Sequence, residues 1–223
     1  LDEAWGPFES FEAARAKMPD TPISDEAPGV DMLYSSGTTG RPKGIKIELK
    51  DEPIDAVNSL VQLAAGLFGF NDKTVYLSPA PLYHAAPLRW CMTTHRLGGT
   101  VIVMEKFDPE QALKLIEKYK VTASQWVPTH FVRMLKLPED VRRKYDISSL
   151  KCAVHAAAPC PVQTKKAMIE WWGPVLKEYY AGSEGNGFCY ISSEEWLKKP
   201  GSVGTAKIGV LKICDENGDE VPV

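Results

Sequence analysis

Alternation of short apolar runs with helical stretches is the feature that most constrains how this chain can fold. Stretches with helical character separate the strand candidates from one another. The strand candidates lie at residues 74–78, 100–104, 121–127, 151–155 and 175–180. Repeated strand-helix alternation favours layers in which a mostly parallel sheet is flanked by helices. We therefore predict an α/β fold, with a hairpin-like C-terminal end at residues 209–223 that turns at Asn217-Gly218.

A polar loop at residues 34–44 has a composition suited to phosphate. It reads Tyr-Ser-Ser-Gly-Thr-Thr-Gly-Arg-Pro-Lys-Gly, and its hydroxyls and lysine can donate hydrogen bonds to phosphate oxygens. Apolar residues at 30–33 and 45–49 predict a strand on each side of it. A Walker A loop would place glycine before the lysine and serine or threonine after it, whereas Pro42 and Gly44 stand there. A phosphotransferase of that kind is disfavoured, and an ordinary polar surface loop is the alternative on composition alone.

The order of residues in this loop resembles the phosphate-loop signature of the adenylate-forming superfamily, which includes acyl-CoA synthetases, peptide-synthetase adenylation domains and luciferases. The resemblance implies that the loop holds the β- and γ-phosphates of ATP, and that the chain is part of the family's N-terminal domain. It implies phosphate contacts from Thr38, Thr39 and Lys43, with Ser35 and Ser36 near phosphate or magnesium. The implied nucleotide-binding residues of the loop are Ser35, Ser36, Gly37, Thr38, Thr39, Gly40 and Lys43.

A second candidate segment, residues 179–185, follows the last of the predicted strands. It reads Tyr-Tyr-Ala-Gly-Ser-Glu-Gly and combines aromatic rings, a hydroxyl and a hard carboxylate. It resembles the family's aromatic-Gly-x-Thr-Glu motif, with an alanine and a serine in place of the usual glycine and threonine. The resemblance implies that Tyr180 stacks on adenine, Ser183 contacts the α-phosphate and Glu184 holds Mg²⁺. The implied nucleotide-binding residues here are Tyr179, Tyr180, Ala181, Gly182 and Ser183, and a plain strand-ending turn is the alternative.

Two more strand ends carry candidate residues, because ligands of open α/β sheets bind beyond the carboxyl ends of strands. The turn at residues 156–161 reads Ala-Ala-Ala-Pro-Cys-Pro and resembles the family's small-residue turn beside the adenine and acyl sites. By that resemblance Ala157, Ala158 and Pro159 contact the nucleotide. The stretch 79–87 resembles the family motif that places a histidine near the carboxylate substrate, which makes His84 the candidate catalytic residue. A structural histidine is an equally good interpretation.

The predicted acyl pocket is apolar. Trp126 and Val127 lie at the end of another predicted strand and resemble the family segment that borders the acyl site, to which His84 also contributes. An apolar wall favours an acyl chain over a polar amino acid. Core packing at a strand end explains Trp126 and Val127 nearly as well.

Composition excludes several classes of function. The net charge of −3 gives no basic footprint for nucleic acid. The 5 cysteines are odd in number and form no Cys-x-x-Cys pair, so we expect no zinc site or disulfide framework and a cytoplasmic setting. Apolar runs fall short of the roughly 20 residues that span a bilayer, so the sequence predicts no transmembrane segment and leaves peripheral membrane contact open.

The resemblance implies an acyl-CoA synthetase. Such an enzyme activates a carboxylic acid with ATP and Mg²⁺ and then transfers the acyl group to CoA. We expect the acid to be a fatty acid. The alternatives are an adenylation domain that loads a carrier protein and a non-catalytic nucleotide-binding module. We expect residues 1–223 to form a single-domain fragment, because the family's C-terminal domain with its catalytic lysine has no match here. A chain of this extent alone is expected to bind nucleotide with little or no turnover.

Overall fold

The computed structural model of the chain describes residues 3–35 and 41–221. Contacts divide the chain into two compact units, one made of Leu1–Asp31 with Ile47–Ala56 and the other of Met32–Lys46 with Val57–Val223. The smaller unit contains the helix α1 (Phe11–Arg15), which begins where the Ser10 hydroxyl accepts a hydrogen bond from the Ala13 amide. The larger unit contains the sheet and every residue that the sequence singled out as a site. The single-domain assignment stays a prediction.

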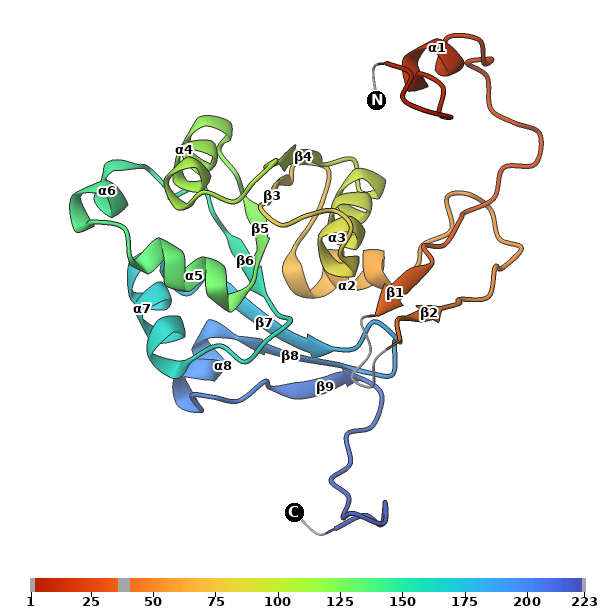
Figure 1. Cartoon of the computed structure of the whole chain (residues 1–223). Helices are drawn as coiled ribbons and strands as arrows, with labels where there is room; N and C mark the ends of the chain where they lie inside the picture. The colour runs from red at the N-terminus through yellow and green to blue at the C-terminus, as the bar shows by residue number, and fades with distance from the viewer. Residues whose placement is uncertain (1–2, 36–40, 222–223) are drawn as a thin grey trace. The chain divides into compact units, whose positions relative to one another are not determined.

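A seven-stranded sheet with the order β4-β3-β5-β6-β7-β8-β9 forms the centre of the larger unit (Figure 1). Its strands are β3 (Val75–Ser78), β4 (Thr100–Val103), β5 (Ala123–Trp126), β6 (Cys152–His155), β7 (Leu176–Ala181), β8 (Phe188–Ser192) and β9 (Thr205–Ile208). The first five are the predicted strands, and neighbouring members of this group pair in parallel. The last two pair antiparallel and were not predicted. The mostly parallel α/β sheet is therefore confirmed.

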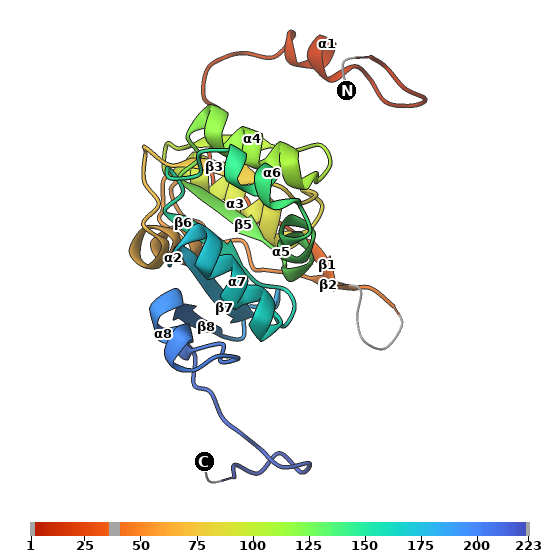
Figure 2. The same ribbon diagram turned by 90° about the vertical axis from the view of Figure 1, so that its left-hand side faces the viewer.

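Helices cover both faces of this sheet. One face carries α2 (Ser59–Phe68) and α3 (Ala85–Arg96), whose Phe68 and Trp90 pack with Tyr76 of the sheet. The other carries α4 (Pro109–Tyr119), α5 (Pro128–Leu135), α7 (Val162–Trp172) and α8 (Ser193–Lys198), with α6 (Glu139–Lys144) beside them. Figure 2 is seen from the side of α4 to α7, with strands behind these helices. The sheet is thus buried between two helical layers, as parallel sheets require.

Local sequence signals set the starts of these helices. Asp108 precedes α4 and accepts a hydrogen bond from the Gln111 amide at 2.8 Å, while Pro109 occupies the first helical position. Asn58 does the same for α2, accepting from the Val61 amide at 2.9 Å. Such caps satisfy backbone donors that the helix itself leaves unpaired.

A separate two-stranded hairpin brackets the predicted phosphate loop. Its strands, β1 (Leu33–Ser35) and β2 (Lys43–Ile45), pair antiparallel with Ser35 opposite Lys43. The strand-loop-strand arrangement is therefore confirmed. Both strands lie closer to the loop than the apolar flanks at 30–33 and 45–49 suggested, because backbone pairing continues into the polar residues.

The C-terminal end is hairpin-like, as predicted, although its pairing is short. The turn is closed by hydrogen bonds from Asp215 N to Asp219 O and from Val221 N to Ile213 O, each 2.9 Å long. A single antiparallel bridge joins Cys214 to Glu220. The described residues of this segment therefore form a turn with one bridge rather than a pair of strands.

The helices are short. The longest, α3, has 12 residues, whereas about 20 are needed to cross a bilayer. Within residues 3–35 and 41–221, no helix combines the length and the hydrophobicity of a membrane span.

The turn before β9 offers a test of the packing between β8 and β9. Gly201 and Gly204 both have positive φ, +90° and +86°. A Cβ added at Gly204 would lie 1.9 Å from the carbonyl oxygen of Tyr190 in β8, whereas one added at Gly201 would lie no closer than 3.8 Å to Val162. We expect Gly204→Ala to lower the free energy of unfolding by about 3 kcal/mol or more, and Gly201→Ala by about 1 kcal/mol.

Chemical denaturation of the two variants measures this difference. Gly201→Ala is the matched control, because it carries the same backbone strain without the collision. Equal losses in the two variants would show that β9 does not approach β8 as closely as the structure has it.

Candidate functional site

Four candidate segments lie at one edge of the sheet. Strands β3, β5, β6 and β7 are parallel to one another, so their carboxyl ends point the same way. His84 follows the end of β3, Val127 follows β5, Ala157 follows β6 and Tyr180 lies at the end of β7. The edge beyond the carboxyl ends of parallel strands is where open α/β sheets bind ligands. The topology therefore brings together stretches that are far apart in the sequence.

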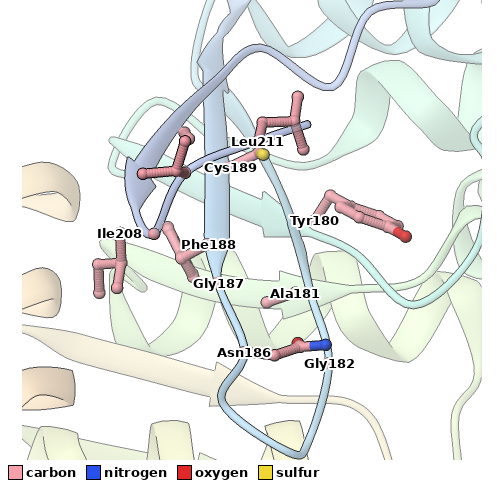
Figure 3. A pocket seen from close by; sticks show the side chains of 12 residues that line it. Tyr180, Ala181, Gly182, Asn186, Gly187, Phe188, Cys189, Ile208 and Leu211 are labelled. Carbon is pink, nitrogen blue, oxygen red and sulfur yellow. The ribbon is translucent and has the colours of Figure 1, made fainter. Parts of the chain in front are cut away.

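A cavity of about 270 Å³ opens beside Tyr180 (Figure 3). One side comes from the end of β7 and the turn into β8, and the other from β9 and the segment that follows it. The lining residues are Tyr180, Ala181, Gly182, Asn186, Gly187, Phe188, Cys189, Ala206, Ile208, Gly209, Val210 and Leu211. Three of them are predicted nucleotide-binding residues. The volume lies near the lower end of the roughly 300–1,000 Å³ typical of small-molecule pockets.

The two adjacent tyrosines of β7 face opposite sides of the sheet, because side chains alternate along a strand. The ring of Tyr179 stacks on Phe188 at 5.1 Å and lies 6.3 Å from the ring of Trp90. Burial raises the pKa of Tyr179, as expected for a ring packed among apolar side chains. Tyr180 is 64% exposed. Tyr180 is therefore the ring available for stacking on a base, while Tyr179 packs into the core on the opposite face of the sheet.

Two side-chain oxygens lie close to Gly182 in the turn between β7 and β8. A Cβ added at Gly182 would lie 2.9 Å from Oε2 of Glu184 and 3.1 Å from Oδ1 of Asn186. Figure 3 shows Asn186 beside Gly182. Carboxylate and amide oxygens suit Mg²⁺, which commonly takes one or two protein carboxylates and completes its shell with water and substrate phosphate. Glu184 therefore fits the predicted role, and Asn186 places a second oxygen beside it that the sequence pattern did not single out.

The turn after β6 contains a strained backbone. Ala157 has φ = +76°, a conformation that side chains with a Cβ adopt at a cost of about 1–2 kcal/mol. Ala157, Ala158 and Pro159 are all exposed, and α7 begins three residues beyond them at Val162. Such strain persists only where the surrounding structure holds it, and it concentrates at functional sites. This conformation was not predictable from the sequence, because a left-handed position is normally marked by glycine.

His84 lies at the surface, at the N-terminus of α3. Its ring is 4.5 Å from the ring of Tyr83, and both residues are exposed. Its side chain does not cap the helix. The imidazole is thus accessible at the edge that carries the other candidates, and its catalytic role stays a prediction.

Trp126 and Val127 occupy different environments. Trp126 is fully buried, its Nε1 donates to Ser124 Oγ at 2.5 Å, and its ring lies 5.4 Å from that of Trp172. This is the core packing that the sequence left open as an alternative. Val127 is half-buried and immediately precedes α5, so it lies nearer the edge of the sheet. Their predicted contribution to an acyl pocket stays a prediction.

Most of the predicted phosphate loop lies outside the described residues. This applies to Ser36, Gly37, Thr38, Thr39 and Gly40. Lys43 is described, is exposed and begins β2 opposite Ser35. The structure therefore defines where the loop starts and ends within the larger unit.

Comparison with known proteins identifies the family. The family model of the AMP-binding enzymes matches residues 3–223, so this chain belongs to the AMP-binding enzyme family. It is 33% identical over 178 residues to the medium/long-chain-fatty-acid–CoA ligase FadD8 of Mycobacterium tuberculosis, covering 78% of this chain and 30% of that protein. It is 30% identical to the 4-coumarate–CoA ligase-like 8 of Arabidopsis thaliana, covering 85% of this chain and 34% of that protein.

A solved structure has the same fold. The ATP-bound MatB of Rhodopseudomonas palustris matches with a TM-score of 0.75 and 25% identity, covering 96% of this chain and 42% of MatB. The chain thus spans about a third of the length of the two curated relatives and less than half of MatB. The fold and family follow from these matches, and the family's enzymes use ATP.

The positive φ of Ala157 yields a stability test. Ala157→Gly removes the strain, and after the entropy cost of a glycine in the unfolded chain we expect a net gain of about 0.5–1 kcal/mol in the free energy of unfolding. The neighbouring exposed Ala158 is the matched control, since the non-glycine residues with positive φ in the described part are Lys120 and Ala157. Ala158→Gly should lower stability by about 0.5–1 kcal/mol. Denaturation curves in which both changes destabilise would contradict the backbone conformation at Ala157.

Proposed function

We propose that the protein containing this chain activates a carboxylic acid as an acyl-adenylate, with release of pyrophosphate, and then forms a thioester with CoA. The observation that carries this proposal is the assembly of four family-like segments beyond the carboxyl ends of β3, β5, β6 and β7. The family match over residues 3–223 supports it.

The chemistry requires that repulsion between a carboxylate and the ATP phosphates be offset. Fixed donors that face developing charge are the largest source of such stabilisation. Lys43 and the hydroxyls of the preceding loop supply positive charge and hydrogen bonds to the phosphates. Tyr180 stacks on the adenine, with the small residues Ala157, Ala158 and Pro159 allowing the ring to approach the backbone. His84 lies near the reacting carboxylate.

Mg²⁺ is the metal that this site suits. Glu184 Oε2 and Asn186 Oδ1, which converge beside Gly182, would hold it in the turn between β7 and β8. When bound, the ion neutralises phosphate charge during the displacement. Water and phosphate oxygens of the nucleotide would complete its shell, as is usual for Mg²⁺ in nucleotide sites.

The acid is proposed to be apolar, with a fatty acid as the first candidate. Val127 at the edge of the sheet offers an apolar wall, and the names of the two relatives refer to 4-coumarate and to medium- and long-chain fatty acids. A cytoplasmic setting is supported by the cysteines, all five of which lie in the described residues as free thiols.

The acceptor is proposed to be CoA, with a carrier protein as the alternative within the enzyme class.

One experiment separates the alternatives. The full-length protein is incubated with MgATP and a panel of carboxylic acids, with and without CoA, and the products are identified by mass spectrometry. Acyl-CoA formed from apolar acids would support the proposal and narrow the substrate. Adenylates that accumulate regardless of CoA would shift the acceptor to a carrier protein. Nucleotide binding without adenylate from any acid would favour a non-catalytic module.

The charge of Lys43 can be tested in the full-length protein. Lys43→Ala should slow adenylation by at least about tenfold, because it removes a cation from the phosphates in the transition state. Lys46→Ala is the control, since Lys46 is also exposed but lies beyond β2. Isotope exchange between pyrophosphate and ATP measures the step, and equal rates for wild type and Lys43→Ala would exclude the assigned role.

The proposed metal ligand gives a second test. Glu184→Gln should raise the Mg²⁺ concentration required for half-maximal adenylation by at least about tenfold, because the neutral amide is a weaker ligand for a hard cation. Glu194→Gln, on the exposed side of α8, should leave the titration unchanged. Superimposable Mg²⁺ titrations for Glu184→Gln and wild type would remove Glu184 from the metal site.

A further inference from the structure

A charged cluster is buried beside the turn at residues 156–161. Lys165 on α7 and His155 at the end of β6 are both 0% exposed, and Glu178 on β7 is 6% exposed. The Lys165 Nζ donates to Oε2 of Glu178 at 2.5 Å, and His155 Nε2 lies 3.6 Å from the same oxygen. None of these three residues was predicted to belong to the site.

Lys165 and Glu178 form the charged part of this cluster. Burial and, to a smaller extent, the positive charge of Lys165 together lower the pKa of His155 to about 3, so the imidazole is neutral at neutral pH. Burial also lowers the pKa of Lys165, while its hydrogen bond to Glu178 acts in the opposite direction. The Lys165 ammonium lies 4.9 Å from the centre of the Trp196 ring, which adds a cation–π contact.

The ion pair joins the elements on both sides of the turn. His155 is the last residue of β6 and pairs in register with Glu178 of β7, and Lys165 is in the first turn of α7. The Lys165 amide donates to Pro161 O at 3.0 Å, and the Ala156 amide donates to Trp126 O at 3.4 Å. The turn therefore lies between a strand and a helix that each carry a member of the cluster.

Two further residues connect the cluster with the site. Cys160 of the turn is half-buried against the core, and its pKa is raised to about 11 by burial and then by the charge of Glu178. The Cys160 thiol is therefore close enough to Lys165 and Glu178 for their charges to act on it. Tyr180 lies two residues after Glu178 on the same strand, so both side chains point to the same face of β7.

Stability alone does not require a buried ion pair. Removing two charges from water is costly, and well-packed apolar residues in their place are often equally stabilising or better. A short charge-assisted hydrogen bond does fix the relative position of the elements that carry its two partners. Ala157, with its positive φ, lies in the turn that such an arrangement would hold.

We propose that Lys165 and Glu178 are positioning residues, which hold the turn 156–161 in the shape that the nucleotide site requires. Neither residue touches the nucleotide. The link to the nucleotide rests on the proposed function, whereas the link to the turn rests on the contacts described above.

The test compares three variants of the full-length protein with wild type. The double variant Lys165→Met/Glu178→Leu replaces the pair with apolar side chains, and Glu178→Gln keeps the shape while removing the charge. The control is Arg143→Gln/Glu139→Gln, which removes an exposed ion pair on α6. For each protein we measure the free energy of unfolding, the hydrogen exchange of the Ala156 and Lys165 amides without ligand, and the dissociation constant for ATP by calorimetry.

The double variant should retain the unfolding free energy of wild type. Its two amides should nevertheless exchange at least about tenfold faster, and its dissociation constant for ATP should rise at least about tenfold. Glu178→Gln should change both quantities in the same direction, and it decides the question should the double variant not fold. Wild-type exchange and affinity in a folded double variant, or in Glu178→Gln, would overturn the positioning role.

The outcomes also separate this inference from the proposed function. A wild-type protein that does not bind ATP would refute the proposed function and the link to the nucleotide. Hydrogen exchange at Ala156 and Lys165 would still decide whether the ion pair holds the turn. Faster exchange with unchanged ATP affinity would refute the positioning role at the nucleotide site.

Discussion

Parallel hydrogen bonding among β3, β5, β6 and β7 is the constraint on which the rest of the larger unit depends. Parallel strands must be joined by crossovers, so helices cover both faces and every loop at one edge follows a carboxyl end. Side chains along β7 then alternate between the two helical layers, which separates Tyr179 from Tyr180. The parallel pairing of the strands therefore determines which residues of the candidate site lie together.

The buried charges and the strained turn belong to the same region of the molecule. Lys165, Glu178 and His155 are buried near the carboxyl ends of the strands, where apolar side chains would be usual. Ala157, two residues after His155, adopts a positive φ. Each of these features costs free energy. The same side of the sheet carries a large hydrophobic core, to which α4, α5 and α7 contribute. Unfavourable local features that cluster at one edge are typical of a functional site.

Prediction from the sequence was most successful where local patterns decide. The five parallel strands, the start of α4 at Asp108 and the strand-loop-strand arrangement around the phosphate loop were all predictable. Strands β8 and β9 were missed because they acquire their partners only through antiparallel pairing at the end of the sheet, where β8 pairs with β7 and β9 pairs with β8. Asn186 was missed for a similar reason, since its proximity to Glu184 depends on the shape of one turn.

The sequence by itself determined the alternation of strands and helices, the polar loop at residues 34–44 and the motifs that resemble the family, because each depends on neighbouring residues. Only the tertiary structure decided that Trp126 is buried in the core, that Tyr180 rather than Tyr179 borders the cavity, and that Lys165 meets Glu178. The physical reason is distance along the chain. Contacts between β6, β7 and α7 depend on how three elements pack, and no local pattern of residues encodes that packing.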